Sequence, residues 1–272
     1  MRTLIAASFI TMFLVMTTFS ASAAIDPNMI LYFAFDEQLD GKMVEDLTGG
    51  GNNGKLKLGA KITNEPAEVY KGAGALKIFN NISAQFRVDE FDRMNKYGEN
   101  TFTFWLYIYG VRKDPCCVQG SVVEKGNVIG QAHKGHAPAI WITDPGLSLV
   151  YKFGDQGAIG VEAVGPGGKG EKFELKKWYH IAGVKQGGSL IIYIDGKEEA
   201  RYKVTRDFVQ GKGHLRIGAT NIRSASFAMD EFGLYDRPLT EQEVELDAKG
   251  IFLSVESETK LTTTWGHLKT DR

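Results

Sequence analysis

Residues 226–250 have the sequence SFAMDEFGLYDRPLTEQEVELDAKG, and this stretch decides the fold. Its first ten residues are mostly apolar or aromatic, which indicates a β-strand that contains Asp230 and Glu231. Pro238 has no backbone N–H to donate, so the strand should end before it. The polar residues that follow predict one short helix. Every other segment with a clear pattern upstream is a strand, so an all-β protein closes here.

The predicted helix carries signals for both of its ends. Thr240 and Glu243 form the Thr-x-x-Glu pattern of a capping box. Leu239 and Val244 occupy the positions of a hydrophobic staple, and Gly250 suits the C-terminal cap. A helix of about ten residues is not stable alone in water. We therefore expect it to pack on a β-sheet.

Asp230 is unusual for its place in the strand. Side chains alternate between the two faces of a strand, so Asp230 shares a face with Ala228, Phe232 and Leu234. A carboxylate among apolar side chains is costly unless another group pairs with it. The sequence therefore predicts a partner for Asp230, either a cation or backbone N–H groups.

Short strands fill the rest of the chain. The clearest is 101–109, which places Phe102, Phe104, Leu106 and Ile108 on one face and aromatic residues on the other. We expect both faces to be covered. The other predicted strands are 29–36, 55–60, 75–80, 84–89, 139–143, 147–153, 158–164, 178–185, 189–195, 199–204 and 214–219. Asp195-Gly196 is the strongest signal for a two-residue hairpin turn. This pattern predicts a β-sandwich with one late helix.

The N-terminus has the features of a secretory signal peptide. Arg2 precedes a mostly apolar run, and Ala21-Ser22-Ala23 forms an A-x-A cleavage site. We predict a leader at 1–23, one β-sandwich domain at 24–252 and a polar tail at 253–272. An uncleaved N-terminal anchor is the alternative. The mature protein should then be secreted, periplasmic or at the cell surface.

The charges nearly balance. Lys and Arg number 32 and Asp and Glu 33, for a net charge of −1. This balance does not favour nucleic acid or an anionic membrane surface as a partner. No segment after the leader has the length of apolar sequence that spans a bilayer.

The two cysteines, Cys116 and Cys117, are adjacent in the sequence. Consecutive α-carbons lie about 3.8 Å apart, below the usual range for a disulfide, so a bond between them would be strained. A vicinal disulfide, two free thiols and a link to another chain all stay open.

Several motifs resemble the laminin-G-like domains of the concanavalin A-like lectin and glucanase superfamily. Residues 178–184 and 190–197 look like their core hairpin, and 32–36 together with 46–56 resembles their opening segment. Residues 72–78 and 229–240 resemble a further strand and the closing strand with its helix. The motifs occur in the order of the family and span about 29–250, whereas 111–138 matches nothing in the pattern.

This resemblance implies a jelly-roll sandwich of two curved antiparallel sheets. It also implies a non-catalytic module that binds a glycan or an extracellular protein, with one structural calcium ion. The matching positions for that ion are the Asp230 side chain and Asp36 or its neighbouring carbonyls. Calcium requires six to eight oxygen ligands. No acidic run like that of an EF-hand is present, so acceptance of backbone hydrogen bonds by Asp230 is the alternative.

The superfamily includes glucan hydrolases, so an enzyme of this type would carry the residues for glycoside hydrolysis. Glycoside hydrolysis requires two carboxylates about 5–9.5 Å apart. The Glu-x-Asp-x-(x)-Glu run of sandwich glucanases does not occur, and Glu198 and Glu199 point to opposite faces. Neither G-x-S-x-G nor H-E-x-x-H is present. We therefore predict that the protein is not an enzyme. A hydrolase with displaced carboxylates and a structural surface or matrix protein are the alternatives.

Four residues are candidates for ligand binding. Trp141 and Tyr151 suit stacking on a sugar ring, although aromatic residues more often pack in a core. His133 and His136 are predicted to lie in a loop, where they bind a ligand or are simply exposed.

Overall fold

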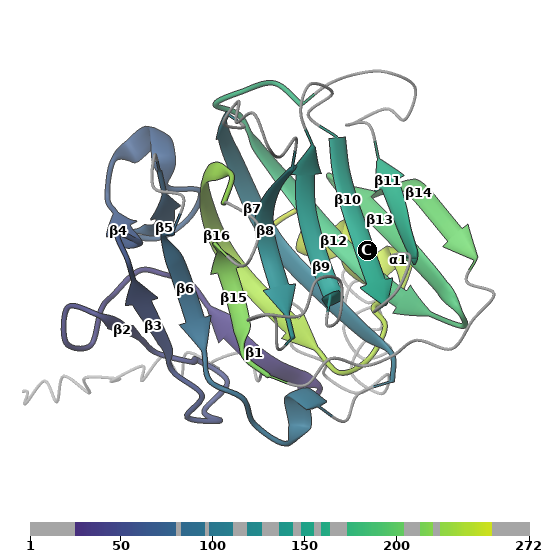
Figure 1. Cartoon of the computed structure of the whole chain (residues 1–272), viewed down its shortest axis with the longest axis horizontal. Coiled ribbons are helices and arrows are strands. Elements are labelled where there is room, and N and C mark those ends of the chain that lie inside the picture. The colour runs from purple at the N-terminus through teal and green to yellow at the C-terminus, as the bar shows by residue number, and fades with distance from the viewer. Residues whose placement is uncertain are drawn as a thin grey trace, which may run out of the picture. The chain divides into compact units, whose positions relative to one another are not determined.

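Two antiparallel β-sheets pack face to face in this computed structural model (Figure 1). The structure describes residues 25–79, 83–95, 98–110, 119–126, 136–143, 148–154, 159–163, 173–203, 213–219 and 224–251. All of them belong to one compact unit. Within these residues the strands and the single short helix confirm the predicted jelly-roll class.

The first sheet, called sheet A, follows the order β14-β13-β12-β7-β16-β5-β4, with β1 also paired to β16. Its strands are β1 (Met29–Phe33), β4 (Lys61–Thr63), β5 (Ala75–Ile78), β7 (Asn100–Gly110), β12 (Trp178–Gln186), β13 (Ser189–Ile194), β14 (Lys197–Lys203) and β16 (Ser226–Tyr235). The hairpin from β13 to β14 turns at Asp195 and Gly196, whose φ values are 50° and 79°. This confirms the predicted turn, since such hairpins require positive φ at both central residues.

The second sheet, sheet B, follows the order β11-β10-β9-β8-β15-β6-β3-β2. Its strands are β2 (Met43–Val44), β3 (Gly54–Lys57), β6 (Gln85–Val88), β8 (Gln119–Lys125), β9 (His136–Thr143), β10 (Ser148–Gly154), β11 (Ile159–Ala163) and β15 (Leu215–Gly218). Two 3₁₀ turns, Pro66–Glu68 and Arg93–Asn95, occur in connections. The short strands β2 and β4, and β8 within 111–138, were not predicted from the sequence.

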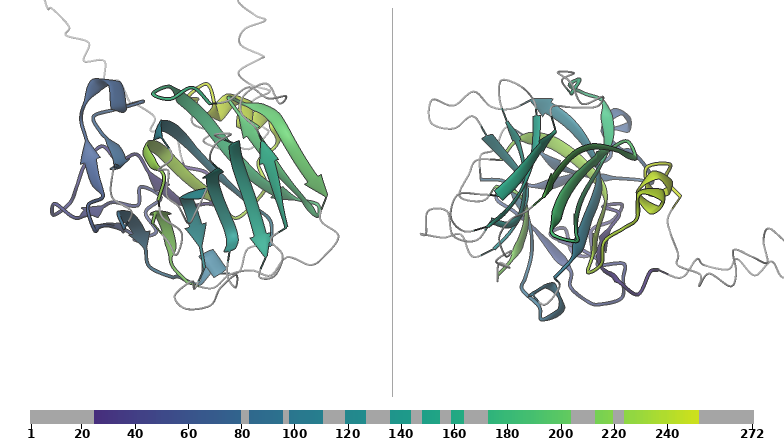
Figure 2. Two further views of the ribbon diagram at one scale, coloured as in Figure 1. Left: turned by 45° about the horizontal axis from the view of Figure 1, so that its top comes forward. Right: turned by 90° about the vertical axis from the view of Figure 1, so that its right-hand side faces the viewer.

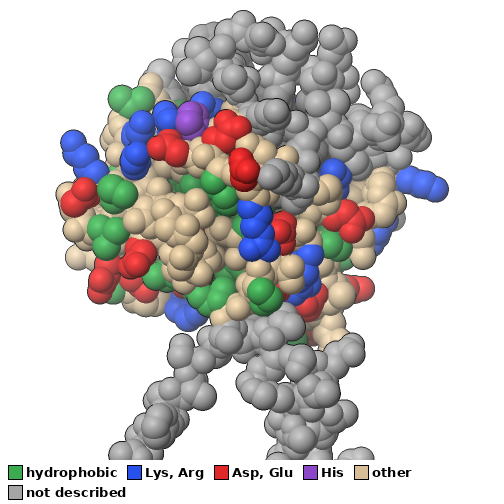
Figure 3. All heavy atoms as spheres, turned by 90° about the horizontal axis from the view of Figure 1, so that it is seen from below, with side chains coloured by type: hydrophobic (Ala, Val, Ile, Leu, Met, Phe, Trp, Pro, Cys, Tyr) green, Lys and Arg blue, Asp and Glu red, His purple; other side chains and the backbone are tan. Residues whose placement is uncertain are grey.

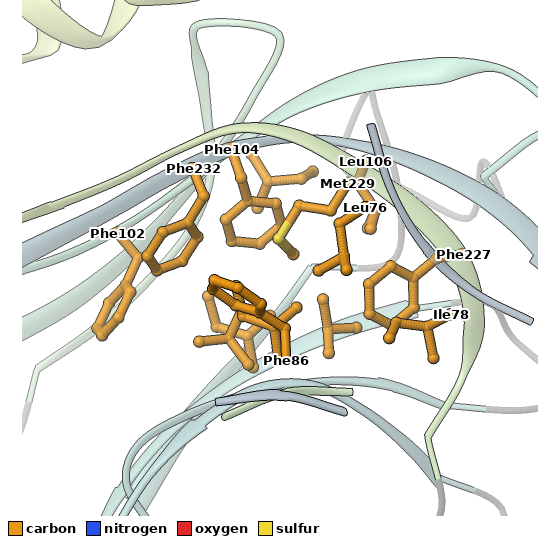
Figure 4. Packing of buried hydrophobic residues seen from close by; sticks show 14 of the residues in the cluster. Leu76, Ile78, Phe86, Phe102, Phe104, Leu106, Phe227, Met229 and Phe232 are labelled. Atoms are coloured by element: carbon orange, nitrogen blue, oxygen red, sulfur yellow. The ribbon is translucent and has the colours of Figure 1, made fainter. Parts of the chain in front are cut away.

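The core lies between the inner faces of the two sheets (Figure 4). The alternating residues Phe102, Phe104 and Leu106 of β7 point into it and are fully buried, as predicted. They meet Phe232 from β16 and, from sheet B, Phe86 of β6. Large rings that interdigitate in this way bury much apolar surface, which is the main stabilising term of the sandwich.

Helix α1 (Glu241–Asp247) lies on the outer side of sheet A (right-hand view of Figure 2). It has seven residues, fewer than the ten expected from the sequence. Thr240 accepts a hydrogen bond from the Glu243 amide, and the Glu243 side chain accepts one from the Thr240 amide, which confirms the capping box. Leu239 and Val244 are buried against Tyr193 and other side chains of the sheet. The helix is thus stabilised by packing, as its length requires.

Candidate functional site

Asp230 lies at a break in the pairing of β16. One edge of β16 pairs with β5 along 227–229 and with β1 along 232–235. Neither strand pairs with Asp230 or Glu231, which fall between them. The pairing of β16 with β7 on the other edge is irregular at the same place. A β-bulge of this kind re-aims side chains locally.

At this break the Asp230 carboxylate accepts hydrogen bonds from three backbone amides. Its Oδ2 accepts from the amides of Tyr70 and Lys71 at 3.0 and 3.1 Å, and its Oδ1 accepts from the Glu231 amide at 2.9 Å. The Asp230 side chain is fully buried. The sequence-based expectation that Asp230 accepts backbone hydrogen bonds is therefore met.

Asp36 contacts the other end of the same turn, residues 70–74. Its Oδ1 accepts from the amides of Ala73 and Gly74 at 2.5 and 3.2 Å. Gly72, between the two ends, has φ +73°, and a Cβ on it would lie 2.1 Å from Asp36 Oδ1. Asp36 and Asp230, the two predicted metal ligands, thus accept hydrogen bonds from opposite ends of one turn.

The backbone is strained next to both acids. Phe35 and Glu231 have φ values of 57° and 50°, which non-glycine residues rarely adopt. Tyr70 stacks on Trp105 of β7, with 3.6 Å between ring centroids and 14° between planes. This ring covers part of the outer aromatic face of β7. The strain persists because hydrogen bonds and stacking hold the 70–74 turn in place.

The pKa of Asp230 is raised to about 7, mainly by burial and also by the nearby charge of Glu231, while the hydrogen bonds from the amides act in the opposite direction. The Glu231 carboxylate also accepts hydrogen bonds, from the Tyr32 hydroxyl at 3.0 Å and from Lys71 Nζ at 2.8 Å. Burial first, and then the charge of Glu231, raise the pKa of Tyr32. The buried Asp230 therefore has one acidic neighbour, Glu231, whose charge is paired with Lys71.

Calcium fits this donor set only in part. No group of three or more His, Cys, Asp or Glu side chains converges within the described residues. Asp230 and Asp36 can supply two hard oxygen ligands, but their oxygens already accept amide hydrogen bonds. The remaining ligands of an ion would have to be carbonyl oxygens, which calcium accepts.

The predicted ligand-binding residues do not form one site. Tyr151 is fully buried in the core between the sheets, and its hydroxyl donates to Asn100 at 3.3 Å. A ligand cannot stack on it there, so core packing describes its role. By the register of β9 and β10, Trp141 points to the face of sheet B opposite to Tyr151. Trp141 is 4% exposed, and Lys152 Nζ lies 4.4 Å from its ring centroid. These two aromatic residues therefore lie on opposite faces of sheet B.

His136 begins strand β9, so the prediction of a loop was wrong for this residue. Its side chain lies outside the described part of the structure, as do His133 and the Cys116-Cys117 pair.

Sheet B carries a site that sequence reasoning missed. A cavity of about 960 Å³ opens on its outer face at β2, β3, β6 and β15, which are neighbouring strands in Figure 1. We call it the basic groove. Its lining includes the cationic side chains Lys42, Lys55, Lys57, Arg87 and Arg216. No acidic residue is among the described residues that line it.

Strand register creates the basic groove. Lys55 of β3 lies directly opposite Arg87 of β6, which lies directly opposite Arg216 of β15. Asp89, outside the lining, pairs with both Lys55 and Arg87, at 3.0 and 2.7 Å. The hydrogen bond from Lys55, together with Arg87, lowers the pKa of Asp89 to about 2. One carboxylate is thus shared by two cations.

Arg216 is the most buried cation of the basic groove, with 7% of its surface exposed. It donates to the Gly126 carbonyl at 3.1 Å, and burial lowers its pKa. Seen from below, acidic, basic and hydrophobic side chains alternate over the described residues (Figure 3). The groove lining differs from this pattern because it carries one sign of charge.

The strands and the order of the two sheets define a jelly-roll β-sandwich. A laminin-G family model, described as the concanavalin A-like lectin/glucanases superfamily, matches residues 81–245. The chain therefore belongs to this family, as the sequence motifs predicted, and the match includes the motifs at 178–197 and 229–240.

Solved structures with this fold include toxin binding domains. The binding domain of botulinum neurotoxin serotype D is 13% identical, with a TM-score of 0.59, and the match covers 82% of this chain and 52% of that one. The binding domain of Paraclostridial Mosquitocidal Protein 1 is 17% identical, with a TM-score of 0.60 and the same coverage. This chain thus spans about half the length of those domains. The similarity establishes the fold.

A comparison with curated proteins finds no match. In the part of the chain that the structure describes, no helix is long and apolar enough to cross a membrane.

Proposed function

We propose that this protein is an exported, non-catalytic binding module, and that the basic groove is its ligand site. The observation that carries the proposal is a cavity of about 960 Å³ in which every charged residue of the described lining is cationic. Ligand sites are typically concave and hold a few placed polar groups. The family and the similar toxin binding domains support a module that recognises an extracellular glycan or protein.

The chemistry of the groove also supports binding without hydrolysis. A glycosidase needs one carboxylic acid to protonate the leaving group and a second carboxylate as nucleophile or base. The described lining supplies neither. Lysine and arginine side chains remain protonated at neutral pH, so they attract and orient a ligand without transferring protons.

The test compares two single charge reversals. Lys57→Glu changes the groove, and Lys203→Glu makes the same change on exposed β14, in sheet A. We expect loss of binding only for Lys57→Glu, on a panel of neutral and charged glycans and secreted proteins. Release of reducing ends from any glycan, or equal binding by both variants, would contradict the proposal.

We further propose that the 70–74 turn contributes to a structural calcium site. Asp230 and Asp36 would hold the ion, and its charge would compensate the buried carboxylate whose pKa is about 7. The strained backbone at Phe35 and Glu231 supports this placement, because strain gathers at ligand sites.

Thermal unfolding with and without EDTA tests the calcium proposal. We expect calcium to raise the melting temperature of the wild type and of Glu199→Gln, but not of Asp230→Asn. Glu199 lies on β14 and serves as the control for loss of one carboxylate. A melting temperature that is the same in calcium and in EDTA would contradict the calcium proposal.

A further inference from the structure

The charge of the protein is segregated. The whole chain has a net charge of −1, yet five cationic side chains and no acidic ones are among the described residues that line the basic groove. Like charges repel and are costly to gather on one surface unless a ligand of opposite charge offsets them. The groove is therefore complementary to an anion.

The cations lie in a row that a chain-like ligand can follow. Lys55, Arg87 and Arg216 occupy directly opposed positions on three neighbouring strands. Adjacent strands are about 4.7–4.9 Å apart, so the row spans roughly 10 Å. Lys57 extends the lining along β3, with Gln85 opposite it on β6, and Lys42 lies in the adjoining segment. Repeating negative charge matches this arrangement better than one small anion does.

The positive charge of the groove is neutralised only in part, although Glu124 of β8 lies directly opposite Arg216. Lys42 and Lys57 form no ion pair with any described residue. Lys55 and Arg87 share the single carboxylate of Asp89. An arginine guanidinium presents a planar set of donors that matches a carboxylate or a sulfate-like oxyanion in two parallel hydrogen bonds. Arg87 already uses Nε and Nη2 on Asp89, and Arg216 uses Nη1 on the Gly126 carbonyl, so only the remaining N–H groups of each guanidinium serve a ligand.

We propose that the basic groove binds a polyanionic glycan, a polysaccharide with sulfate or carboxylate groups along its chain. This inference rests on the proposed function and names the ligand class of the same site. The anionic groups pair with the row of Lys55, Arg87 and Arg216. Gln85 offers a neutral donor and acceptor to sugar hydroxyls.

Two other polyanions fit the groove less well. Single-stranded nucleic acid is usually held by aromatic side chains that stack on its bases, and none is among the described residues of the lining. An anionic membrane is an extended surface, which would contact protruding side chains, whereas these cations line a concave cavity. The groove favours a flexible chain that enters it.

The test uses a double variant that leaves the internal ion pairs intact. Lys42→Gln with Lys57→Gln removes two cations of the groove that have no ion pair among the described residues. Lys197→Gln with Lys203→Gln removes the same charge from exposed β14 and is the matched control. Probes are a sulfated polysaccharide, a polyuronate, a neutral glucan, single-stranded DNA, anionic lipid vesicles and the secreted proteins of the panel above, with binding measured by calorimetry. Unchanged melting temperatures verify that the variants fold.

We expect the groove variant to bind the two anionic glycans about tenfold more weakly or worse, while the control stays within about twofold of the wild type. Affinity should also fall as ionic strength rises. One outcome overturns this inference and leaves the proposed function standing. It is groove-dependent binding of a neutral glycan or a protein, without binding of anionic glycans. Stronger groove-dependent binding of single-stranded DNA or anionic vesicles also overturns it. If no probe's binding depends on the groove, both proposals fail.

Discussion

Asp36 and Asp230 accept hydrogen bonds from opposite ends of one turn. Asp230 contacts the amides of Tyr70 and Lys71, and Asp36 contacts those of Ala73 and Gly74. The turn leads into β5, and the two acids belong to β16 and to the segment after β1. Three segments that are distant in sequence are joined here by carboxylates.

Gly72 should tolerate no side chain. Gly72→Ala places a Cβ 2.1 Å from Asp36 Oδ1 at a φ of +73°. Positive φ alone costs roughly 1 kcal/mol or more for alanine, and the contact with Asp36 adds to this. We expect a larger loss of unfolding free energy than at a glycine with open space, measured by urea denaturation.

Gly188→Ala is the matched control for Gly72→Ala. Gly188 has φ +76° and nothing within 4 Å of its would-be Cβ, so it reports the backbone cost alone. Equal losses for the two variants would mean that the Asp36 contact does not constrain the turn.

Asp230 should make the stability depend on pH in the absence of metal ions. Its folded-state pKa of about 7 lies above the ordinary value of 3.8. Between those values the folded chain binds a proton that the unfolded chain does not, so stability decreases as pH rises from about 4 to about 7. The decrease attributable to Asp230 is at most roughly 4 kcal/mol.

Asp230→Asn isolates this effect, because asparagine keeps an acceptor oxygen and does not titrate. The difference in unfolding free energy between wild type and variant, measured in EDTA at several pH values, should change across this range in the direction stated. A constant difference from pH 4 to 7.5 would show that Asp230 has an ordinary pKa.

Arg237 should be critical for the closing segment. Its Nη2 lies 2.6 Å from Asp26 Oδ2 and 2.7 Å from Glu243 Oε1, so it joins the start of the described chain to helix α1. Asp26 is 1% exposed. Arg237→Met removes the ion pair of this buried carboxylate and leaves it only the hydrogen bonds from Asn28, at a cost of about 3 kcal/mol.

The control for Arg237→Met is Arg201→Met. Arg201 pairs with Glu198 while its own side chain is 48% exposed, so its loss should cost about 1 kcal/mol or less. Denaturant midpoints of the two variants measure the difference. Comparable midpoints would contradict a structural role for the Arg237 pairs.

Much of the fold follows from local patterns in the sequence. The alternation in 101–109 identified the core face of β7, and the capping box identified the start of α1, because both depend on residues a few positions apart. Strands β2 and β4 were missed because two or three residues are too few to show a period. Strand β8 lies in a segment without clear alternation.

The candidate sites were predictable only in part. Asp230 was recognised because a carboxylate at a core position needs a partner, and parity alone reveals that conflict. Its actual partners, the amides of Tyr70 and Lys71, carry no signal in their side-chain identity. The alternation within each strand shows which residues share a face with Tyr151 and which share a face with Trp141. It does not show which of those faces points to the core.

The sequence by itself determined the class of the fold, the ends of its helix and the need to compensate Asp230. Its near-balanced charge gave no sign of a cationic surface. Only the tertiary structure placed Lys55, Arg87 and Arg216 in one row, because strand order and register are set by long-range packing of the two sheets. Local pattern decides which face a side chain takes, and packing decides which neighbours it meets there.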